Sequence, residues 1–257
     1  MPRVLILRTA GTNCDAELAH AFEMAGARAE YVHLNALVES PEHIAEFDIL
    51  GLPGGFSYGD DIAAGRIFAT RIRHRLYPSI RRFIHDGKPI LGVCNGFQVL
   101  VKAGLLPAFD LPGDAAPPQT ATLADNADAR FSDRWVAVRA EPDSPCIWTR
   151  GLGGFDLPIA HGEGRFVTRD DILDRLEANG QVALRYADGD NPNGSMRNIA
   201  GVCDPTGLVF GLMPHPERFT HATHHPDWTR KRIEPAGLRF FQNAVSYVQS
   251  ARASVAA

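Results

Sequence analysis

The sequence KPILGVCNGFQVL, residues 88–100, predicts the fold around it. Its apolar first half is typical of a buried strand, and the apolar residues from Phe97 onward indicate a helix. Cys94 therefore lies where the strand becomes a helix. Gly92 and Gly96 flank it in the pattern G-x-C-x-G, the thiol version of the nucleophile elbow, in which small residues allow a sharp turn that holds the nucleophile outward.

A thiol at this turn faces the N-terminus of the following helix. The unpaired N–H groups and the helix dipole at that end favour the thiolate, which is the nucleophilic form. We therefore interpret Cys94 as a nucleophile. The motif alone leaves one alternative, a buried structural cysteine, because free cysteine is among the most buried residue types.

A second stretch, GLVFGLMPHPER at residues 207–218, offers a base and an acid. Its apolar run ends in two prolines that flank His215, fix φ on both sides of it and prevent the strand from continuing. His215 is thereby presented at a strand end, with Glu217 two residues further along. Together with Cys94, these residues supply a nucleophile, a base and an orienting acid.

The chain has 257 residues, a net charge of −4 and no break in composition, so we expect one domain covering residues 1–257. The acidic balance argues against nucleic acid as a partner. No stretch approaches the length of a membrane span, and the apolar run near the N-terminus is too short for a signal peptide. Cys14, Cys94, Cys146 and Cys203 lie far apart, which indicates neither a disulfide framework nor a metal site. A reduced, cytoplasmic setting fits best.

Strands alternate with helices in the first part of the chain, which predicts a parallel sheet covered on both faces. In such sheets, ligands bind beyond the carboxyl ends of the strands. Residues 53–60, PGGFSYGD, follow the third strand and belong on the same rim as Cys94. Their paired glycines can turn backbone N–H groups toward a ligand, or can simply form a turn.

The expected strands of this first part of the chain are 3–8, 31–34 and 48–52. The expected helices are 16–25 with an N-cap at Thr12 or Asn13, a short one opened by Ser40 and Pro41, and 67–85.

The β-α alternation breaks after the helix that follows Cys94, and the rest of the chain predicts antiparallel additions. Residues 159–165, IAHGEGR, look like a loop that contacts a ligand or partner, although a plain turn fits equally well. The expected elements are a Pro-rich loop at 110–119, antiparallel strands or an edge hairpin within 120–139, a helix at 171–178, a strand at 182–186, a turn-rich loop at 191–194, a hairpin of 199–202 with 208–213, an amphipathic helix at 238–248 and a frayed end from 251.

Two groups of polar residues have a plain and a functional interpretation. The helix 67–85 carries Arg71, Arg73, Arg75, Arg81 and Arg82, and we favour a solvated basic face over a docking surface. A histidine-rich group beside Trp228 could bind a metal, but we favour a solvent-facing loop because no carboxylate spacing supports a metal. That group consists of His221, His224 and His225.

The two motifs around Cys94 and His215 resemble those of class I (triad) glutamine amidotransferases. Within that family, the chain is most similar to the glutaminase subunits of phosphoribosylformylglycinamidine synthase, and the similarity runs nearly end to end. The stretches that carry it are GTNCD at 11–15, PGGFSYGD at 53–60, AHGEGR at 160–165 and NPNGS at 191–195. The resemblance implies an α/β fold of the flavodoxin-like kind, with a mostly parallel sheet, helices on both faces and antiparallel edge additions.

The resemblance also implies a role for individual residues. Cys94 attacks the carboxamide of glutamine, His215 exchanges the proton and Glu217 orients His215. The backbone near Gly55 and Asn95 binds the oxyanion, and Gln98 helps to hold the substrate. The full set implied for substrate and oxyanion binding is Gly54, Gly55, Phe56, Asn95, Gln98, His161 and Gly162.

The released ammonia needs an acceptor, and the sequence has no G-x-x-x-x-G-K-[ST] motif or other recognisable ATP cradle. The resemblance implies a partner, a large synthetase subunit that uses ATP and Mg and is sometimes joined by a third small subunit. That partner converts formylglycinamide ribonucleotide to formylglycinamidine ribonucleotide in de novo purine biosynthesis. Residues 61–64 and 219–235 depart from the resembled pattern and are candidate surfaces for partner contact.

Two other classes of protein remain open from the sequence. A free-standing Cys-His hydrolase, peptidase-like or chaperone-like, of the same wider fold explains Cys94 but not the Pro-His-Pro-Glu strand end. A glutamine-sensing or scaffold domain with a relic triad is the non-enzymatic alternative, although a relic is expected to have lost a catalytic residue. Release of glutamate from glutamine separates the amidotransferase from both.

Overall fold

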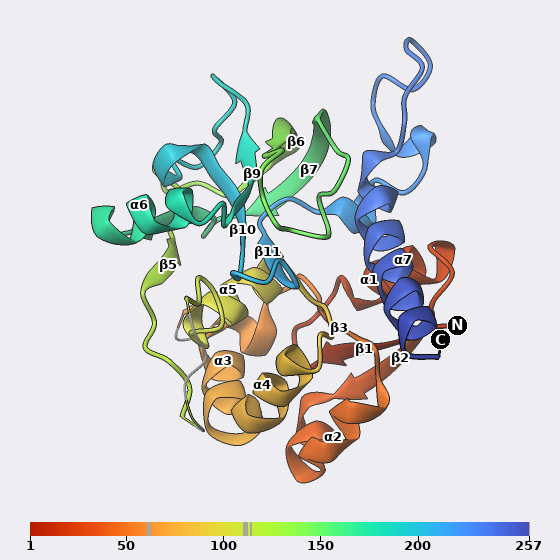
Figure 1. The fold of residues 1–257 in the computed structure, drawn as a ribbon. Helices are drawn as coiled ribbons and strands as arrows, with labels where there is room; N and C mark the ends of the chain where they lie inside the picture. Colours follow the sequence, from red (N-terminus) through yellow and green to blue (C-terminus); the bar gives the residue numbers. More distant parts are fainter. Residues whose placement is uncertain (61–62, 110–112, 114, 257) are drawn as a thin grey trace.

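A nine-stranded sheet forms the centre of the computed structural model, which describes residues 1–257 except 61–62, 110–112, 114 and 257 (Figure 1). Five neighbouring strands are parallel, in the order β2-β1-β3-β4-β11, and four more continue the sheet in antiparallel fashion as β10-β9-β6-β7. The flavodoxin-like expectation is thus confirmed, together with its antiparallel additions. The bounds are β1 Arg3–Arg8, β2 Arg28–His33, β3 Ile49–Leu52, β4 Ile90–Val93, β11 Val209–Leu212, β10 Ile199–Cys203, β9 Val182–Tyr186, β6 Ser132–Ala140 and β7 Gly154–His161.

Helices cover both faces of the parallel strands. Helices α1 and α7 lie on one face, and α3, α4 and α5 lie on the other (Figure 1). The bounds are α1 Asp15–Met24, α2 Leu34–Glu39, α3 Arg66–Arg71, α4 Tyr77–His85, α5 Asn95–Lys102, α6 Asp170–Ala178 and α7 Ala236–Ala256. None of the helices among the described residues has the length and apolar character needed to cross a membrane.

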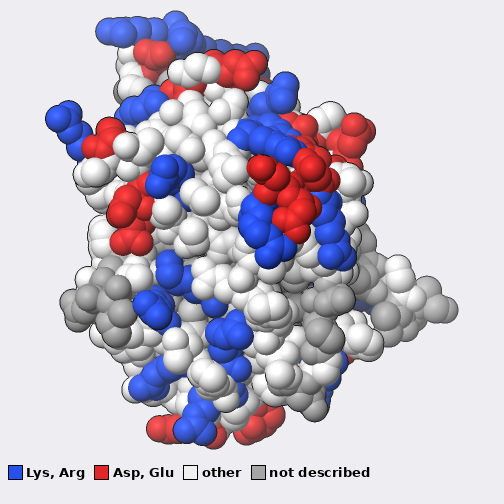
Figure 2. All heavy atoms as spheres, turned by 90° about the vertical axis from the view of Figure 1, so that its left-hand side faces the viewer, with Lys and Arg blue, Asp and Glu red and all other residues white. Residues whose placement is uncertain are grey.

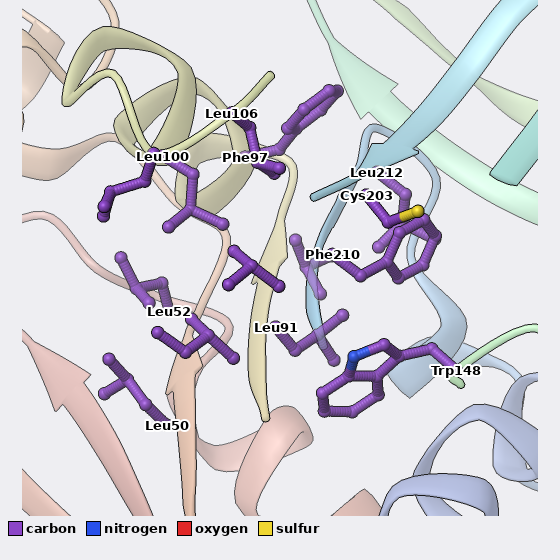
Figure 3. Close-up of a cluster of buried hydrophobic side chains, with 14 of the residues drawn as sticks. Leu50, Leu52, Leu91, Phe97, Leu100, Leu106, Trp148, Cys203, Phe210 and Leu212 are labelled. Carbon is purple, nitrogen blue, oxygen red and sulfur yellow. The ribbon is translucent and has the colours of Figure 1, made fainter. Parts of the chain in front are cut away.

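The core follows the central strands β3, β4 and β11, whose residues are all buried. Figure 3 shows Leu50 and Leu52 of β3 on one side of β4, and Phe210 and Leu212 of β11 on the other. Strands buried on both faces are typical of parallel sheets with two helical layers, and they explain the continuous apolar runs in the sequence. The carboxyl ends of β4 and β11 therefore meet at a rigid edge.

Several expected elements differ from the structure. The expected helix 67–85 is divided by a π-helical segment, Ile72–Leu76, between α3 and α4. The stretch 120–139 forms antiparallel strands, which is one of its two expected structures, but it does not form a hairpin. Its first strand, β5 (Ala121–Ala124), pairs with β8 (Arg165–Thr168) in a separate two-stranded sheet. Helix α2 was not expected. Residues 251–256 continue α7 instead of fraying, and part of the expected loop 110–119 lies outside the described residues.

The helical surface that carries the arginines is positively charged. Figure 2 shows this face: Lys and Arg spread over its lower half with Asp and Glu only at the bottom edge, whereas the upper half carries both signs. Two of the arginines bind within the protein, since Arg71 donates to Asn35 Oδ1 (2.7 Å) and Arg73 to the Pro117 carbonyl (2.7 Å). The solvated basic face stays a prediction.

Candidate active site

Cys94 occupies the strand-to-helix turn that the sequence predicts. It follows β4, precedes α5, and has φ +50° and ψ −107°, a conformation that a non-glycine residue rarely adopts. The neighbouring glycines make this turn possible. A Cβ on Gly96 would lie 2.0 Å from the Leu52 carbonyl oxygen, and one on Gly92 would lie 2.7 Å from the carbonyl oxygen of Gly96. The strained backbone is a feature of nucleophile elbows.

His215 and Glu217 form a buried pair at the end of β11. His215 Nδ1 lies 2.6 Å from Glu217 Oε1, and the two residues are 1% and 4% exposed. The His215 N–H donates to the Pro158 carbonyl (2.8 Å), which fixes the backbone that presents the imidazole. Burial alone would lower the pKa of His215, but the Glu217 carboxylate and then the charge on Cys94 raise it well above its usual value. The Glu217 carboxylate therefore favours the protonated, imidazolium form of His215.

Gly54 lies where Cys94 and His215 come together. A Cβ at this position would be 2.9 Å from His215 Cε1 and 3.5 Å from Cys94 Cβ. A side chain here would enter the space between thiol and imidazole, so the site requires glycine. The three strand ends that carry Gly54, Cys94 and His215 thus meet at one rim, as the sequence predicts.

The loop 54–58 is held by the loop that precedes α1. Asn13 N and Cys14 N donate to the Gly54 carbonyl (3.4 and 3.3 Å), and Phe56 N donates to the Gly11 carbonyl (2.9 Å). These bonds surround an isolated antiparallel bridge between Thr12 and Gly55. At such a pair the N–H of Gly55 points away from Thr12. No hydrogen bond from this N–H to the described residues is present, so it is available to a ligand.

The N–H of Phe56, unlike that of Gly55, is used in a hydrogen bond within the protein. This N–H donates to the Gly11 carbonyl, and the Phe56 side chain is 47% exposed at the rim. In this conformation Phe56 is therefore not an oxyanion donor. The next N–H, that of Ser57, donates to Asn95 Oδ1 (3.2 Å) and joins the loop to the residue after the nucleophile.

Asn95 and Gln98 belong to a buried chain of amide hydrogen bonds. Asn95 Nδ2 donates to Gln98 Oε1 (2.9 Å), and Gln98 Nε2 donates to the Glu163 carbonyl (2.6 Å). The chain connects the loop of Ser57 to the turn after β7. Both amides hold loops in place, and Gln98 keeps one N–H donor and some acceptor capacity on Oε1 for a substrate.

His161 lies at the end of β7, next to Ala160, whose carbonyl oxygen is 3.8 Å from Cys94 Sγ. Asn126 Nδ2 donates to the carbonyls of His161 and Arg130, so its Oδ1 is an acceptor and receives the His161 Nδ1–H (3.1 Å). Burial, and secondly the charge on His215, lower the pKa of His161 to about 4. His161 is thus neutral, and its buried Nε2 has no partner among the described residues. It is an acceptor inside the site.

The turn after His161 is held by the same asparagine. Asn126 N donates to the Gly162 carbonyl (2.8 Å), and Asn126 Oδ1 also accepts from Gly164 N (3.2 Å). Sequence reasoning missed Asn126, because nothing in the stretch 120–139 distinguishes it. It also assigned no role to Cys14 or Arg218, whose side chains meet beside His215 at 3.1 Å.

The side chains around His215 include residue types that bind metal ions. Cys14, His215 and Glu217 each present one ligand atom, and these atoms lie within 4.8 Å of one another. However, two ligands of one tetrahedral zinc ion with bonds of about 2 Å stand roughly 3.3 Å apart. The 2.6 Å between His215 and Glu217 is a hydrogen-bond distance. The geometry fits proton transfer better than metal binding.

The histidine-rich segment that follows Arg218 is only partly solvent-facing. His221 and His224 are exposed, as expected, but His225 is buried. Its Nε2 lies 3.2 Å from Asp156 Oδ2, and its ring contacts Trp135. The expectation of a solvent-facing loop is therefore wrong for His225, which anchors this segment on β7.

Comparison with known proteins places the chain in a defined group. Residues 1–248 match the family described as the CobB/CobQ-like glutamine amidotransferase domain. The subunit PurQ of phosphoribosylformylglycinamidine synthase from Dehalococcoides mccartyi is 42% identical over 96% of this chain and 98% of its own length. The corresponding subunit from Treponema denticola is 40% identical over 96% and 99%.

One solved structure supports the same grouping, and another shows the same fold. A chain in the structure of PurLQS from Thermotoga maritima superposes with a TM-score of 0.74 at 32% identity, covering 96% of this chain and 99% of that one. A glutamine amidotransferase from the same organism shares the fold, with a TM-score of 0.54 at 14% identity over 96% of this chain and 97% of its own.

Proposed function

Because the chain belongs to the CobB/CobQ-like glutamine amidotransferase family, we propose that it is the glutaminase subunit of a phosphoribosylformylglycinamidine synthase. It hydrolyses glutamine to glutamate and supplies ammonia to a partner synthetase. That synthetase converts formylglycinamide ribonucleotide to formylglycinamidine ribonucleotide in de novo purine biosynthesis. The observation that carries the proposal is the buried His215–Glu217 pair, which meets the strained Cys94 turn at Gly54.

The first half of the reaction is attack on the carboxamide. The Cys94 thiolate adds to the amide carbon of glutamine, and the carbonyl oxygen becomes an oxyanion. The protonated His215 then donates its Nε2 proton to the leaving nitrogen, so ammonia departs and a γ-glutamyl thioester remains on Cys94. The raised pKa of His215 suits this step, since it favours the protonated ring that donates to the leaving nitrogen.

The second half is hydrolysis of the thioester. His215 is neutral after ammonia has left, and it removes a proton from a water molecule that attacks the thioester carbon. Collapse of the second oxyanion releases glutamate and restores the thiolate and the imidazolium. Glu217 keeps its 2.6 Å hydrogen bond to Nδ1 throughout and stabilises the positive ring.

The oxyanion needs two donors on one side of the thiol. We assign them to the N–H of Gly55, which the bridge to Thr12 leaves available, and to the N–H of Asn95 at the first position of α5. The donor from Asn95 also gains from the positive end of the helix dipole. Gly54, His161 and Gly162 line the remaining space for the substrate.

The partner supplies the energy of the coupled reaction. We assign no cofactor to this chain, in agreement with the lack of an ATP cradle in the sequence, and we assign ATP and Mg to the large synthetase subunit. The relative from Thermotoga maritima is described as part of PurLQS, which supports a complex with two further subunits. We place the activity in the cytoplasm, where the four free, buried cysteines would remain reduced.

The test is the fate of the amide nitrogen. Glutamine labelled with nitrogen-15 at the amide is given to this chain with the synthetase subunits, formylglycinamide ribonucleotide and ATP. The proposal predicts glutamate release and nitrogen-15 in the amidine product. Hydrolysis of peptide substrates without glutamate release would instead favour the free-standing Cys-His hydrolase.

A further inference from the structure

Cys14 contacts the Gly54 loop and lies beside His215, although it is not part of the triad. It is 2% exposed and directly precedes α1. Its backbone N–H donates to the Gly54 carbonyl (3.3 Å), and its Sγ lies 3.1 Å from the Cβ position of Gly54. His215 Cε1 is 2.9 Å from the same position, so the second thiol and the imidazole lie on one side of Gly54.

Besides its interaction with the His215 side chain, the thiol of Cys14 has hydrogen bonds to two other residues. Its Sγ donates to Asn13 Oδ1 (3.2 Å) and accepts from Arg218 Nη2 (3.1 Å). Arg218 also pairs with Glu17 in α1, with Nε 3.3 Å from Oε1. Since Arg218 directly follows Glu217, these contacts tie the turn Pro216–Arg218 to α1.

We propose that Cys14 is a positioning residue for His215 and Glu217. Its main chain fixes the Gly54 carbonyl, and its thiol fixes Arg218 and thereby the carboxylate that orients the imidazole. The inference rests on the proposed glutaminase function but adds a residue to it. A shift of Arg218 would lengthen the 2.6 Å bond between Glu217 and His215, and an oriented imidazole is what the proton transfers require.

Electrostatics agrees with this geometry. Burial first of all raises the pKa of Cys14, so the residue is a thiol and does not compete with Cys94 as a nucleophile. Cys14 is in turn one of the groups that raise the pKa of His215, after Glu217 and Cys94. Its removal should lower that pKa.

The experiment compares Cys14→Ala, Cys14→Ser and a control, Cys146→Ala. Cys146 is also a free cysteine and 2% exposed, but it belongs to no contact described for the active site. Two properties are measured: kcat and KM for glutamine hydrolysis by the assembled enzyme, and the pH dependence of alkylation of Cys94 by iodoacetamide, with the modified peptide identified by mass spectrometry.

Cys14→Ala should lower kcat about tenfold with little change in KM, which is the size expected for one lost hydrogen bond to a charged group. The alkaline step of the alkylation profile, which reports the loss of the His215 proton, should move to lower pH, because Cys14 is one of the groups that raise the pKa of His215. Cys14→Ser keeps a donor and an acceptor and should recover most of kcat and of the profile. Cys146→Ala should leave both unchanged.

Two results would overturn the proposal: a wild-type kcat and alkylation profile in Cys14→Ala, or an equal kinetic loss in Cys146→Ala. A loss of folded protein alone lowers the apparent kcat but does not move the alkylation profile. If the wild-type enzyme released no glutamate, the proposed function would fail. The alkylation profiles would still decide whether Cys14 positions His215.

Discussion

His215 Nδ1 and Glu217 Oε1 lie 2.6 Å apart, and nearly all of both side chains is buried. The pair is built from residues two apart in sequence, across a proline that prevents β11 from continuing. Because the carboxylate is the first of the groups that raise the pKa of His215 against burial, it determines the pH range in which the ring carries its proton.

Replacement of Glu217 should therefore change the pH dependence as well as the rate. Glu217→Gln keeps a hydrogen-bond acceptor for Nδ1 but removes the negative charge, so the pKa of His215 falls. The imidazolium then loses its proton at lower pH, and the alkaline limb of the kcat profile moves to lower pH. The rate should fall about a hundredfold less than in His215→Ala, as in another catalytic triad. An unmoved alkaline limb, or a greater loss than in His215→Ala, would mean that the roles are misassigned.

The elbow should tolerate no added methyl group. Gly96→Ala would place its Cβ 2.0 Å from a backbone carbonyl of β3, so the turn or the strand must shift. We expect a loss of about 2–4 kcal/mol in the free energy of unfolding, measured by urea denaturation. Gly153→Ala is the matched control, because nothing lies within 4 Å of its Cβ position, and it should stay within about 0.5 kcal/mol of wild type. Equal effects of the two substitutions would contradict the packing described for Gly96.

His161 should make the folded protein sensitive to acid. Its pKa is about 4 in the folded chain, below the usual value of 6.5, so below pH 6.5 the unfolded chain binds a proton that the folded chain does not. Stability is therefore lost as the pH falls from 6.5 toward 4. At pH 5 this amounts to about 2 kcal/mol. The drop in unfolding free energy between pH 7 and pH 5 should be smaller by that amount in His161→Gln. The same drop in both proteins would show that His161 is not the group responsible.

The isolated chain should be a poor glutaminase. Cys94 is 6% exposed and His215 1%, so glutamine has little access to the thiol in this conformation. A partner that shifts the loop 54–58 could admit glutamine and orient the Gly55 N–H, and one oxyanion donor accounts for roughly a hundred- to a thousandfold in turnover. Steady-state glutamate release is measured for the chain alone and then with the synthetase, its acceptor and ATP. Equal rates would contradict this coupling.

Local sequence was sufficient for the features that depend on near neighbours. The Cys94 turn follows from two glycines at fixed spacing, and the presentation of His215 follows from its two prolines. The break in the expected helix 67–85 also had a local signal. Pro78 has no N–H to donate to the preceding turn, and the π-helical segment Ile72–Leu76 ends just before it.

The rest of the site depends on contacts between distant parts of the chain. Arg218 meets Cys14 across 204 positions, and Asn126 meets His161 across 35. Periodicity describes one segment at a time and carries no information on such pairs. The same reason explains β5, whose alternating pattern predicts a strand but not its partner, β8.

The most direct test of the account separates ammonia production from its use. Cys94→Ala is assembled with the synthetase subunits, and formation of formylglycinamidine ribonucleotide is measured with glutamine and, separately, with ammonium salt. In the proposed mechanism, Cys94 acts only in the release of ammonia. Synthesis from glutamine should therefore disappear, while synthesis from ammonium continues at the wild-type rate. Synthesis from glutamine that persists in Cys94→Ala would contradict the assignment of Cys94 as the nucleophile.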